Sequence, residues 1–153
     1  MTVALVTGGA GFIGSTLVDT LVDNGTKVVV VDNESSECNK QFYYNGMASY
    51  YKVSINNLEA LQAICHTYKP DLIFHLASES RIQPTLERPI DACQTNFIGT
   101  CNVLECARKH NARVMYSSTS SAYGCNESPQ VETMNTDCLN PYSVSKVAGE
   151  ELC

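Results

Sequence analysis

The sequence is poor in charge and has no long apolar run. Only 17% of its 153 residues are charged, and the formal net charge is -6 at pH 7. Because no basic stripe is present, the composition argues against a nucleic-acid partner. The first apolar run, residues 3–6, is too short for a signal peptide, and no stretch approaches the roughly 20 apolar residues of a membrane span. We therefore expect a cytoplasmic protein that does not enter a membrane.

Metal-ligand and disulfide spacings are also missing, although the chain has eight cysteines. No two of them form a CxxC pair, and none has a histidine at ligand spacing. Several fall within helical periodicity, where a free cysteine acts as a small apolar residue. We expect no metal site and reduced thiols, as in a reducing compartment. The cysteines are Cys38, Cys65, Cys93, Cys101, Cys106, Cys125, Cys138 and Cys153.

What the sequence does contain is an alternation of strand-like and helix-like segments. Short apolar, β-branched runs predict strands at 3–7, 27–32, 51–54, 71–78 and 112–118. Apolar residues at helical spacing predict helices from about Phe12 to Asn24, from 58 to 69, from 90 to 111, and from Pro141 to Cys153. Loops are predicted at 33–49, around Pro84 and Pro89, and at 124–138.

This alternation predicts an α/β fold. Strands joined by helical crossovers form a parallel sheet with helices on both faces. The architecture is the doubly wound, Rossmann-like sheet, which binds ligands outside the carboxyl ends of its strands. The length suits a single domain over residues 1–153.

A glycine-rich turn follows the first predicted strand. In TGGAGFIG, residues 7–14, Gly8, Gly11 and Gly14 fit the pattern GxxGxxG, and Gly9 begins a GxGxxG. In such a turn one glycine allows the tight bend and a second lets the backbone approach a diphosphate. The third lets the helix pack closely on the strand. Between a strand and a helix, the pattern indicates a dinucleotide site.

Two further features favour NAD as the dinucleotide. The helix that begins at Phe12 and Ile13 offers free N–H groups and a positive dipole end to phosphates. Asp32 ends the second strand, where its carboxylate can accept hydrogen bonds from both ribose hydroxyls and would repel a 2′-phosphate. The sequence therefore predicts NAD rather than NADP.

The stretch YSVSK places a tyrosine and a lysine on one helix face. Tyr142 and Lys146 are four residues apart, or about one turn. A phenol with a pKa of about 10 is a poor base, and lowering that pKa by about three units takes roughly 4 kcal/mol. A nearby ammonium and a cationic nicotinamide have the right charge to do so. The pair is a candidate for proton transfer.

Hydroxyl groups gather at the end of the fifth predicted strand, in SSTSSAYG, residues 117–124. A hydroxyl at this edge can donate to a substrate oxygen and share its proton with the tyrosine. Thr119 is our first candidate for the catalytic hydroxyl and Ser118 the second. His75 ends a buried strand, where we expect it to bind a backbone partner rather than act as a general base.

Taken together, these motifs resemble the extended short-chain dehydrogenase/reductase family. TGGAGFIG, the Asp-Asn pair after strand two, HLAS, SSTSSAYG and YSVSK occur in its order and at its spacing, over essentially the whole chain. More narrowly, the chain is similar to NAD-dependent nucleotide-sugar epimerases and dehydratases.

The resemblance implies a mechanism and further site residues. NAD stays tightly bound, Tyr142 takes a proton from a sugar hydroxyl, and hydride passes to NAD and returns to the keto-sugar. Lys146 binds the nicotinamide ribose and lowers the pKa of Tyr142, while Asn96 helps to order the site. The further cofactor-lining residues that it implies are Asn33, Leu76, Ala77 and Ser78.

The resemblance to UDP-glucose 4-epimerases favours epimerisation of a UDP-sugar. The segment HLASES resembles the corresponding segment of dTDP-glucose 4,6-dehydratases. Those enzymes have an Asp-Glu pair after the catalytic threonine, as acid and base for removing water, and this chain has Ser120 and Ser121 there. The family also has an aspartate that reaches the adenine after strand three, where this chain has Ser54. We therefore expect weaker adenine recognition.

Family members continue for about as long again beyond this segment. We therefore expect residues 1–153 to form an NAD-binding domain without the later strands and the nucleotide-sugar domain, and with the fifth strand as an exposed sheet edge. A catalytically inactive NAD-binding module is the alternative interpretation. The resemblance also implies a homodimer through the helices that follow strands four and five.

Overall fold

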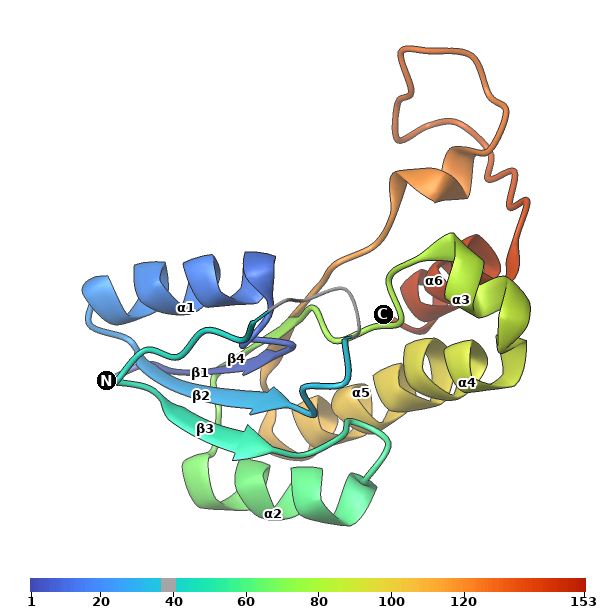
Figure 1. Cartoon of the computed structure of the whole chain (residues 1–153). Coiled ribbons are helices and arrows are strands. Elements are labelled where there is room, and N and C mark those ends of the chain that lie inside the picture. Colours follow the sequence, from blue (N-terminus) through green and yellow to red (C-terminus); the bar gives the residue numbers. More distant parts are fainter. Residues whose placement is uncertain (37–40) are drawn as a thin grey trace.

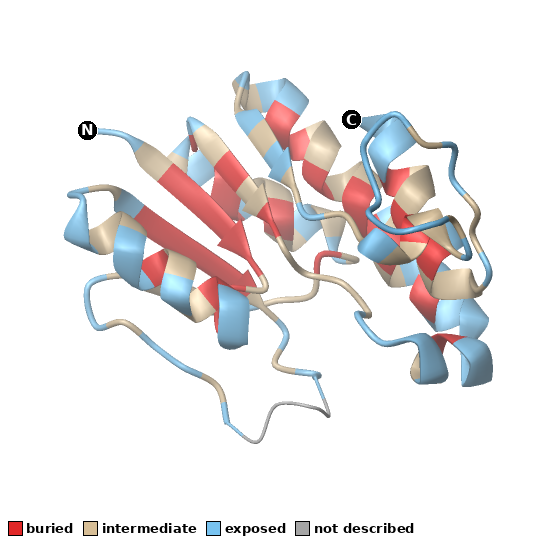
Figure 2. Ribbon diagram, turned by 90° about the horizontal axis from the view of Figure 1, so that it is seen from above, coloured by how far each residue is buried: buried red, intermediate tan, exposed pale blue. Residues whose placement is uncertain are grey.

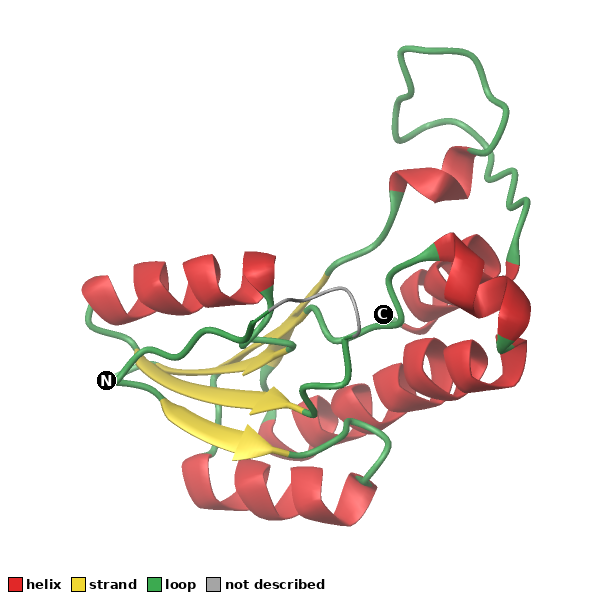
Figure 3. Cartoon of the chain, in the orientation of Figure 1, coloured by secondary structure: helices red, strands yellow, loops and turns green. Residues whose placement is uncertain are grey.

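The chain forms a five-stranded parallel sheet in the order β3-β2-β1-β4-β5 (Figures 1 and 3). The computed structural model describes residues 1–36 and 41–153, so Cys38 lies outside the described residues. The predicted fold class, a doubly wound α/β sheet of five strands, is confirmed. The strands are β1 (Val3–Thr7), β2 (Lys27–Asp32), β3 (Ser49–Lys52), β4 (Leu72–His75) and β5 (Arg113–Tyr116).

Helices cover both faces of the sheet (Figure 1). Helix α1 (Phe12–Asp23) lies on one face, and α2 (Leu58–Tyr68) and α5 (Gly99–His110) lie on the other. A separate group lies beyond the carboxyl ends of the strands. This group consists of α3 (Ile82–Glu87), α4 (Pro89–Cys93) and α6 (Pro141–Leu152).

Strand side chains alternate between two apolar cores. Leu5, Val29 and Ile73 pack with α2 and α5, whereas Val6 and Val30 pack with α1. The central strands β1 and β2 are consequently buried on both faces, as the red bands in Figure 2 show. The continuous β-branched run of β2 is explained by this double burial. The two cores hold the carboxyl ends of the strands at one edge.

Strand three is two residues earlier than predicted. It spans Ser49–Lys52 rather than 51–54, because it pairs in parallel with β2 from Val29↔Ser49 to Asp32↔Lys52. The chain then turns, and the backbone N–H of Asn57 donates to the carbonyl of Ser54 at 2.9 Å. The predicted strand therefore included residues that belong to this turn.

A short helix replaces the predicted loop around Pro84. Helix α3 accommodates the proline in its first turn, where a missing N–H costs no helical hydrogen bond. The side chain of Gln83 donates to Glu87 at 2.9 Å, one turn later. The loop prediction is therefore wrong here, because a proline near a helix start does not break the helix.

The predicted helix over 90–111 is interrupted by a π-helix, η1 (Gln94–Ile98), between α4 and α5. A π turn carries one extra residue and is frequent at functional sites. Asn96 lies in it and is buried. The periodicity of the sequence predicted helix here but not its change of pitch.

Strands β4 and β5 are shorter than predicted, 72–75 and 113–116 rather than 71–78 and 112–118. Beyond each strand the chain leaves the sheet. After β5 it forms a short 3₁₀ helix, η2 (Ser120–Tyr123), and a long loop before α6. Segments that the sequence assigned to strands thus become available to line a site.

The described part of the chain shows neither a membrane-length apolar helix nor a cluster of three or more potential metal-ligating side chains. Its cysteines are all free thiols.

Candidate active site

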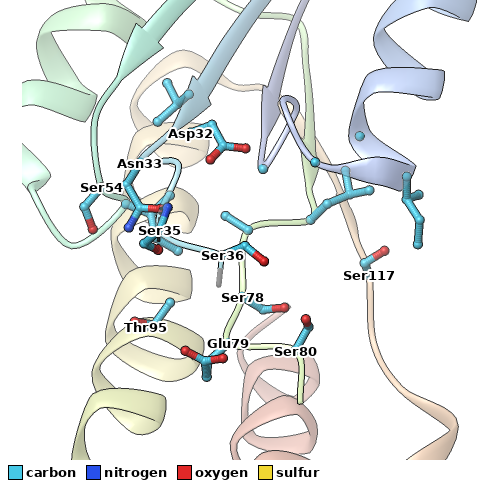
Figure 4. A pocket seen from close by; sticks show the side chains of 18 of the residues that line it. Asp32, Asn33, Ser35, Ser36, Ser54, Ser78, Glu79, Ser80, Thr95 and Ser117 are labelled. Atoms are coloured by element: carbon cyan, nitrogen blue, oxygen red, sulfur yellow. Dashed lines mark hydrogen bonds between the residues drawn. The ribbon is translucent and has the colours of Figure 1, made fainter. Parts of the chain in front are cut away.

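A cavity of about 570 Å³ opens at the carboxyl edge of the sheet (Figure 4). It is lined by the glycine turn, the end of β2, the segments after β4 and β5, and the first turns of α6. Most of the residues that the sequence singled out meet on its wall. These are Gly8, Gly11, Phe12, Ile13, Gly14, Asp32, Asn33, Leu76, Ala77, Ser78, Ser118, Tyr142 and Lys146.

The glycine turn is too tightly packed for side chains. Gly8 has a φ of +71°, and a Cβ on it would lie 2.8 Å from the backbone nitrogen of Ala77. A Cβ on Gly14 would overlap the carbonyl oxygen of Gly8 and lie 2.7 Å from the Cα of Gly9. Gly14 thus permits the close helix–strand packing expected of a dinucleotide turn.

The N-terminus of α1 is suited to an anion. Its N-cap is Gly11, no described side chain caps it, and its first turn carries no acid. Phe12 and Ile13 are 76% and 70% exposed and line the cavity. Backbone N–H groups at this end, together with the helix dipole, fit a diphosphate.

Asp32 is oriented by the backbone around it. Its Oδ2 accepts from the N–H of Ala10 at 3.0 Å, and its Oδ1 accepts from the N–H of Glu34 at 2.8 Å. A carboxylate has about four acceptor positions, so about two remain for ribose hydroxyls. The acid that ends β2 therefore fits the sugar next to the diphosphate.

Helix α6 brings Tyr142 and Lys146 to the cavity. Asn140 caps the helix by accepting from the N–H of Ser143 at 2.9 Å, and Pro141 occupies the first position. Lys146 is only 3% exposed, and its Nζ lies 4.2 Å from the centroid of the Tyr116 ring. Burial lowers the pKa of Lys146 to about 8. Lys146 therefore reaches the cavity while almost all of its side chain is enclosed by protein.

The structure places Ser118, rather than Thr119, on the cavity wall. The Oγ of Ser118 is buried and has no hydrogen-bond partner among the described residues. The Oγ1 of Thr119 instead accepts from the N–H of Ser121 at 3.1 Å and caps η2. Thr119 thus accepts a capping hydrogen bond and keeps its own proton to donate, so both hydroxyls stay candidates.

Asn96 does not line the cavity but ties its walls together. Its Oδ1 accepts from the N–H of Glu79 at 2.7 Å, and its Nδ2 donates to the carbonyl of Glu79 and to Ser145 Oγ, both at 3.0 Å. The amide thus connects the segment after β4 to α6. This arrangement is compatible with the ordering role that the resemblance implied.

His75 has a different environment from the one predicted. Its ring contacts two threonine hydroxyls, Thr7 at 2.7 Å and Thr100 at 3.0 Å, rather than a backbone partner. Burial, followed by the charge of Lys146, lowers the pKa of His75 to about 3. The ring is therefore neutral and enclosed, and it does not line the cavity as a general base would.

One wall of the cavity was missed by the sequence reasoning. It follows β4 and continues through α3, where the predicted loop offered no pattern to interpret. It ends in the π-helix, within the predicted helix over 90–111. The only signal was position, because polar residues directly after a buried strand reach the ligand edge of such a sheet. The residues are Glu79, Ser80, Pro84, Arg88 and Thr95.

Comparison with known proteins places this geometry in a family. The family described as "NAD dependent epimerase/dehydratase family" matches residues 4–153. A UDP-N-acetyl-alpha-D-glucosaminuronate decarboxylase from Bacillus cytotoxicus is 32% identical over 97% of this chain. That match covers 48% of the relative, so the chain spans about half of its length.

Two solved structures share the fold closely. UDP-glucose 4-epimerase of Thermotoga maritima with UDP-glucose has a TM-score of 0.92 and 37% identity, covering 99% of this chain and 50% of that chain. UDP-glucose 4-epimerase of Thermus thermophilus in complex with NAD has a TM-score of 0.91 and 28% identity. The match covers 99% of this chain and 49% of that chain. Both are similar to this chain over about half of their own length.

Proposed function

Because the chain belongs to the NAD-dependent epimerase/dehydratase family, we propose that residues 1–153 form the NAD-binding domain of a nucleotide-sugar epimerase. The observation that carries this proposal is a single cavity lined by the glycine turn, Asp32 and the Tyr142–Lys146 pair. A UDP-sugar is the proposed substrate, supported by the two epimerases of similar structure. We propose the complete epimerisation for a chain about as long as those two epimerases.

The residues present fit NAD. The bare turn at Gly8 and Gly14 would hold the diphosphate, and Asp32 would hold the adenosine ribose. The carboxylate would repel a 2′-phosphate, so NAD is proposed over NADP. Ala77 and Ser78, which line the cavity in the segment after β4, would contact the nicotinamide end.

Bound NAD supplies reversible hydride acceptance. Tyr142 would remove the proton from the sugar hydroxyl, and Lys146, which lies one helical turn away, lines the same cavity. A hydroxyl at the end of β5, that of Thr119 or of Ser118, would donate to the same sugar oxygen. The pKa of Lys146, about 8, leaves the side chain mostly charged at pH 7. Together these groups can move the proton in both directions.

Two alternative functions can be distinguished from that of an epimerase. A 4,6-dehydratase needs an acid and a base beside the sugar, and Ser120 and Ser121 in η2 provide no carboxyl group. A binding module without turnover is the other alternative, because the dinucleotide features of the cavity can bind NAD whether or not a sugar reacts. The test below separates this module from an epimerase.

We also propose a cytoplasmic location and a homodimer. The free thiols of the described cysteines support a reducing compartment.

The dimer is supported by exposed apolar residues on the helices that the resemblance assigns to a dimer face. They are Ile90 in α4, Ile98 in η1 and Val144 in α6. Sedimentation of the purified chain at several concentrations tests this assembly, and a concentration-independent monomer would contradict it.

The function is tested by calorimetry and a conversion assay on the same preparation. We expect NAD to bind the purified chain. Interconversion of UDP-glucose and UDP-galactose would then establish epimerase activity, whereas NAD binding without conversion would support the binding module. Replacing Tyr142 by Phe should abolish any turnover, and Tyr123→Phe, which changes a tyrosine outside the cavity lining, is the matched control. Turnover by Tyr142→Phe would contradict the assigned base.

A further inference from the structure

A chain of buried hydrogen bonds crosses the molecule beneath the cavity. It begins at Ala77 on the cavity wall, whose backbone N–H donates to the Oγ1 of Thr7 at 3.2 Å. The Oγ1 of Thr7 lies 2.7 Å from Nδ1 of His75. These contacts connect the segment after β4 to the end of β1.

The chain continues on the other side of the imidazole. Nε2 of His75 lies 3.0 Å from the Oγ1 of Thr100 in α5, and that hydroxyl donates to the carbonyl of Asn96 at 2.7 Å. The side chain of Asn96 donates to Ser145 Oγ at 3.0 Å, which donates to the carbonyl of Tyr142 at 2.8 Å. The cavity wall is therefore linked to the backbone of the candidate base.

The donors and acceptors in this chain follow from the short contact between the Thr100 hydroxyl and the carbonyl of Asn96. A carbonyl oxygen only accepts, so the hydroxyl proton of Thr100 is committed to Asn96. The oxygen of Thr100 must then accept from a protonated Nε2 of His75. Because the neutral ring carries one N–H, Nδ1 is bare and accepts from the hydroxyl of Thr7. His75 is thereby assigned as the Nε2–H tautomer.

Every side chain in this series is withdrawn from solvent. Thr7, His75, Asn96 and Thr100 are each at most 1% exposed, and Ser145 is 3% exposed. Removing one member leaves a buried donor and a buried acceptor without partners, which is more costly than losing a surface contact. The series has no alternative partner in water, so its members share one arrangement.

We propose that His75 is a positioning residue that couples the cofactor wall at Ala77 to the placement of Tyr142, and that it does so as the neutral Nε2–H tautomer. Filling the cavity beside Ala77 then also stabilises the start of α6. The inference rests on the proposed function, because it requires NAD to bind this cavity.

Hydrogen exchange of the purified chain with and without NAD tests the coupling. Thr100→Val keeps the branched shape but removes the hydroxyl between His75 and Asn96, and Thr100→Ser retains that hydroxyl as the matched control. We expect NAD to slow exchange in residues 141–152 of the wild-type chain. In Thr100→Val we expect that slowing to decrease by about tenfold, and Thr100→Ser should restore it.

The glycine turn reports cofactor binding in the same experiment. Slower exchange of residues 3–23 with NAD shows that the cofactor binds, whatever happens in α6. If the turn is protected in all three proteins and α6 responds equally in each, the coupling is refuted and the proposed function stands. If NAD protects nothing in the wild-type chain, both the proposed function and the coupling are refuted.

The tautomer is tested on the wild-type chain alone, independently of whether Thr100→Val folds. Long-range proton–nitrogen NMR of the ¹⁵N-labelled protein should show His75 protonated at Nε2 and bare at Nδ1. A proton on Nδ1 would reverse the deduced direction at both threonines and overturn the assignment. Loss of the Nε2–H pattern in Thr100→Val, with retention in Thr100→Ser, is expected if the hydroxyl selects the tautomer.

Discussion

At the residue scale, polar side chains in the interior are held in single states by their partners. His75 is 1% exposed and sits between Thr7 and Thr100, so both of its nitrogens have a hydroxyl partner. A second proton would leave one of those hydroxyls without an acceptor and would charge a buried ring. The same residue therefore makes the stability of the fold sensitive to acid.

We predict that His75 makes the free energy of unfolding decrease as the pH is lowered. Its pKa is about 3 in the folded chain and about 6.5 when unfolded. As pH falls below about 6.5, the unfolded chain binds a proton that the folded chain does not, and each pH unit costs about 1.4 kcal/mol. Above that pH this contribution vanishes.

Urea unfolding at pH 7, 6 and 5 measures this slope. Comparison with His75→Gln isolates it from the carboxyl groups, and His66→Gln, which changes an exposed histidine, is the control. An identical loss of stability between pH 7 and 5 in the wild type and His75→Gln would contradict the prediction.

The glycine turn gives a second prediction at this scale. Gly14→Ala would force a methyl group into the carbonyl of Gly8, so the helix or the turn must move. We expect the free energy of unfolding to fall by about 1–3 kcal/mol and NAD binding to weaken. Gly46→Ala is the matched control, because a Cβ there meets no atom within 4 Å. Denaturant titration measures the stabilities and calorimetry the binding, and equal stabilities would show that the turn adapts.

At the scale of the element, the two ends of the site depend on how helices begin. Helix α1 leaves its N-terminus uncapped by described side chains and available to a ligand, whereas α6 is closed by a capping box between Asn140 and Ser143. The first arrangement offers free N–H groups to phosphates. The second fixes the first turn of α6, from which Tyr142 reaches the cavity.

We predict that Asn140→Ala destabilises the chain by about 1 kcal/mol, because the N–H of Ser143 loses its acceptor. Asn140→Asp retains an acceptor of the same shape and should cost little. Urea unfolding gives the magnitude, and hydrogen exchange should place the loss in α6. Equal destabilisation by both substitutions would show that the cap is not its cause.

At the scale of the whole molecule, the sheet ends in a strand with one open side. Strand β5 pairs only with β4 among the described residues, and Met115 within it is 55% exposed. An unpaired strand edge with an exposed apolar residue favours association with other chains. The edge agrees with the sequence expectation for the fifth strand.

We predict that Met115→Lys reduces self-association of the purified chain, because a charge on an edge strand opposes pairing. Light scattering across a concentration series measures the effect. Met47→Lys, at a residue that is 82% exposed but outside the strands, adds the same charge as a control. Equal reductions would assign the effect to net charge rather than to the edge.

The local pattern of the sequence determined much of this protein. β-branched runs between amphipathic segments specify a parallel sheet, and glycines between a strand and a helix specify a phosphate turn. Spacing within one helix was enough to bring Tyr142 and Lys146 to the same cavity. Each of these features depends on neighbours within a few residues, which a sequence displays directly.

Only the tertiary structure decided which side chains share a partner. Asn96 bonds to Ser145, 49 residues away, and His75 bonds to Thr7, 68 residues away. The π turn and the identity of the hydroxyl on the cavity wall depend on such contacts. Their energies come from burial beside distant segments, and no periodicity along the chain records which segments those are.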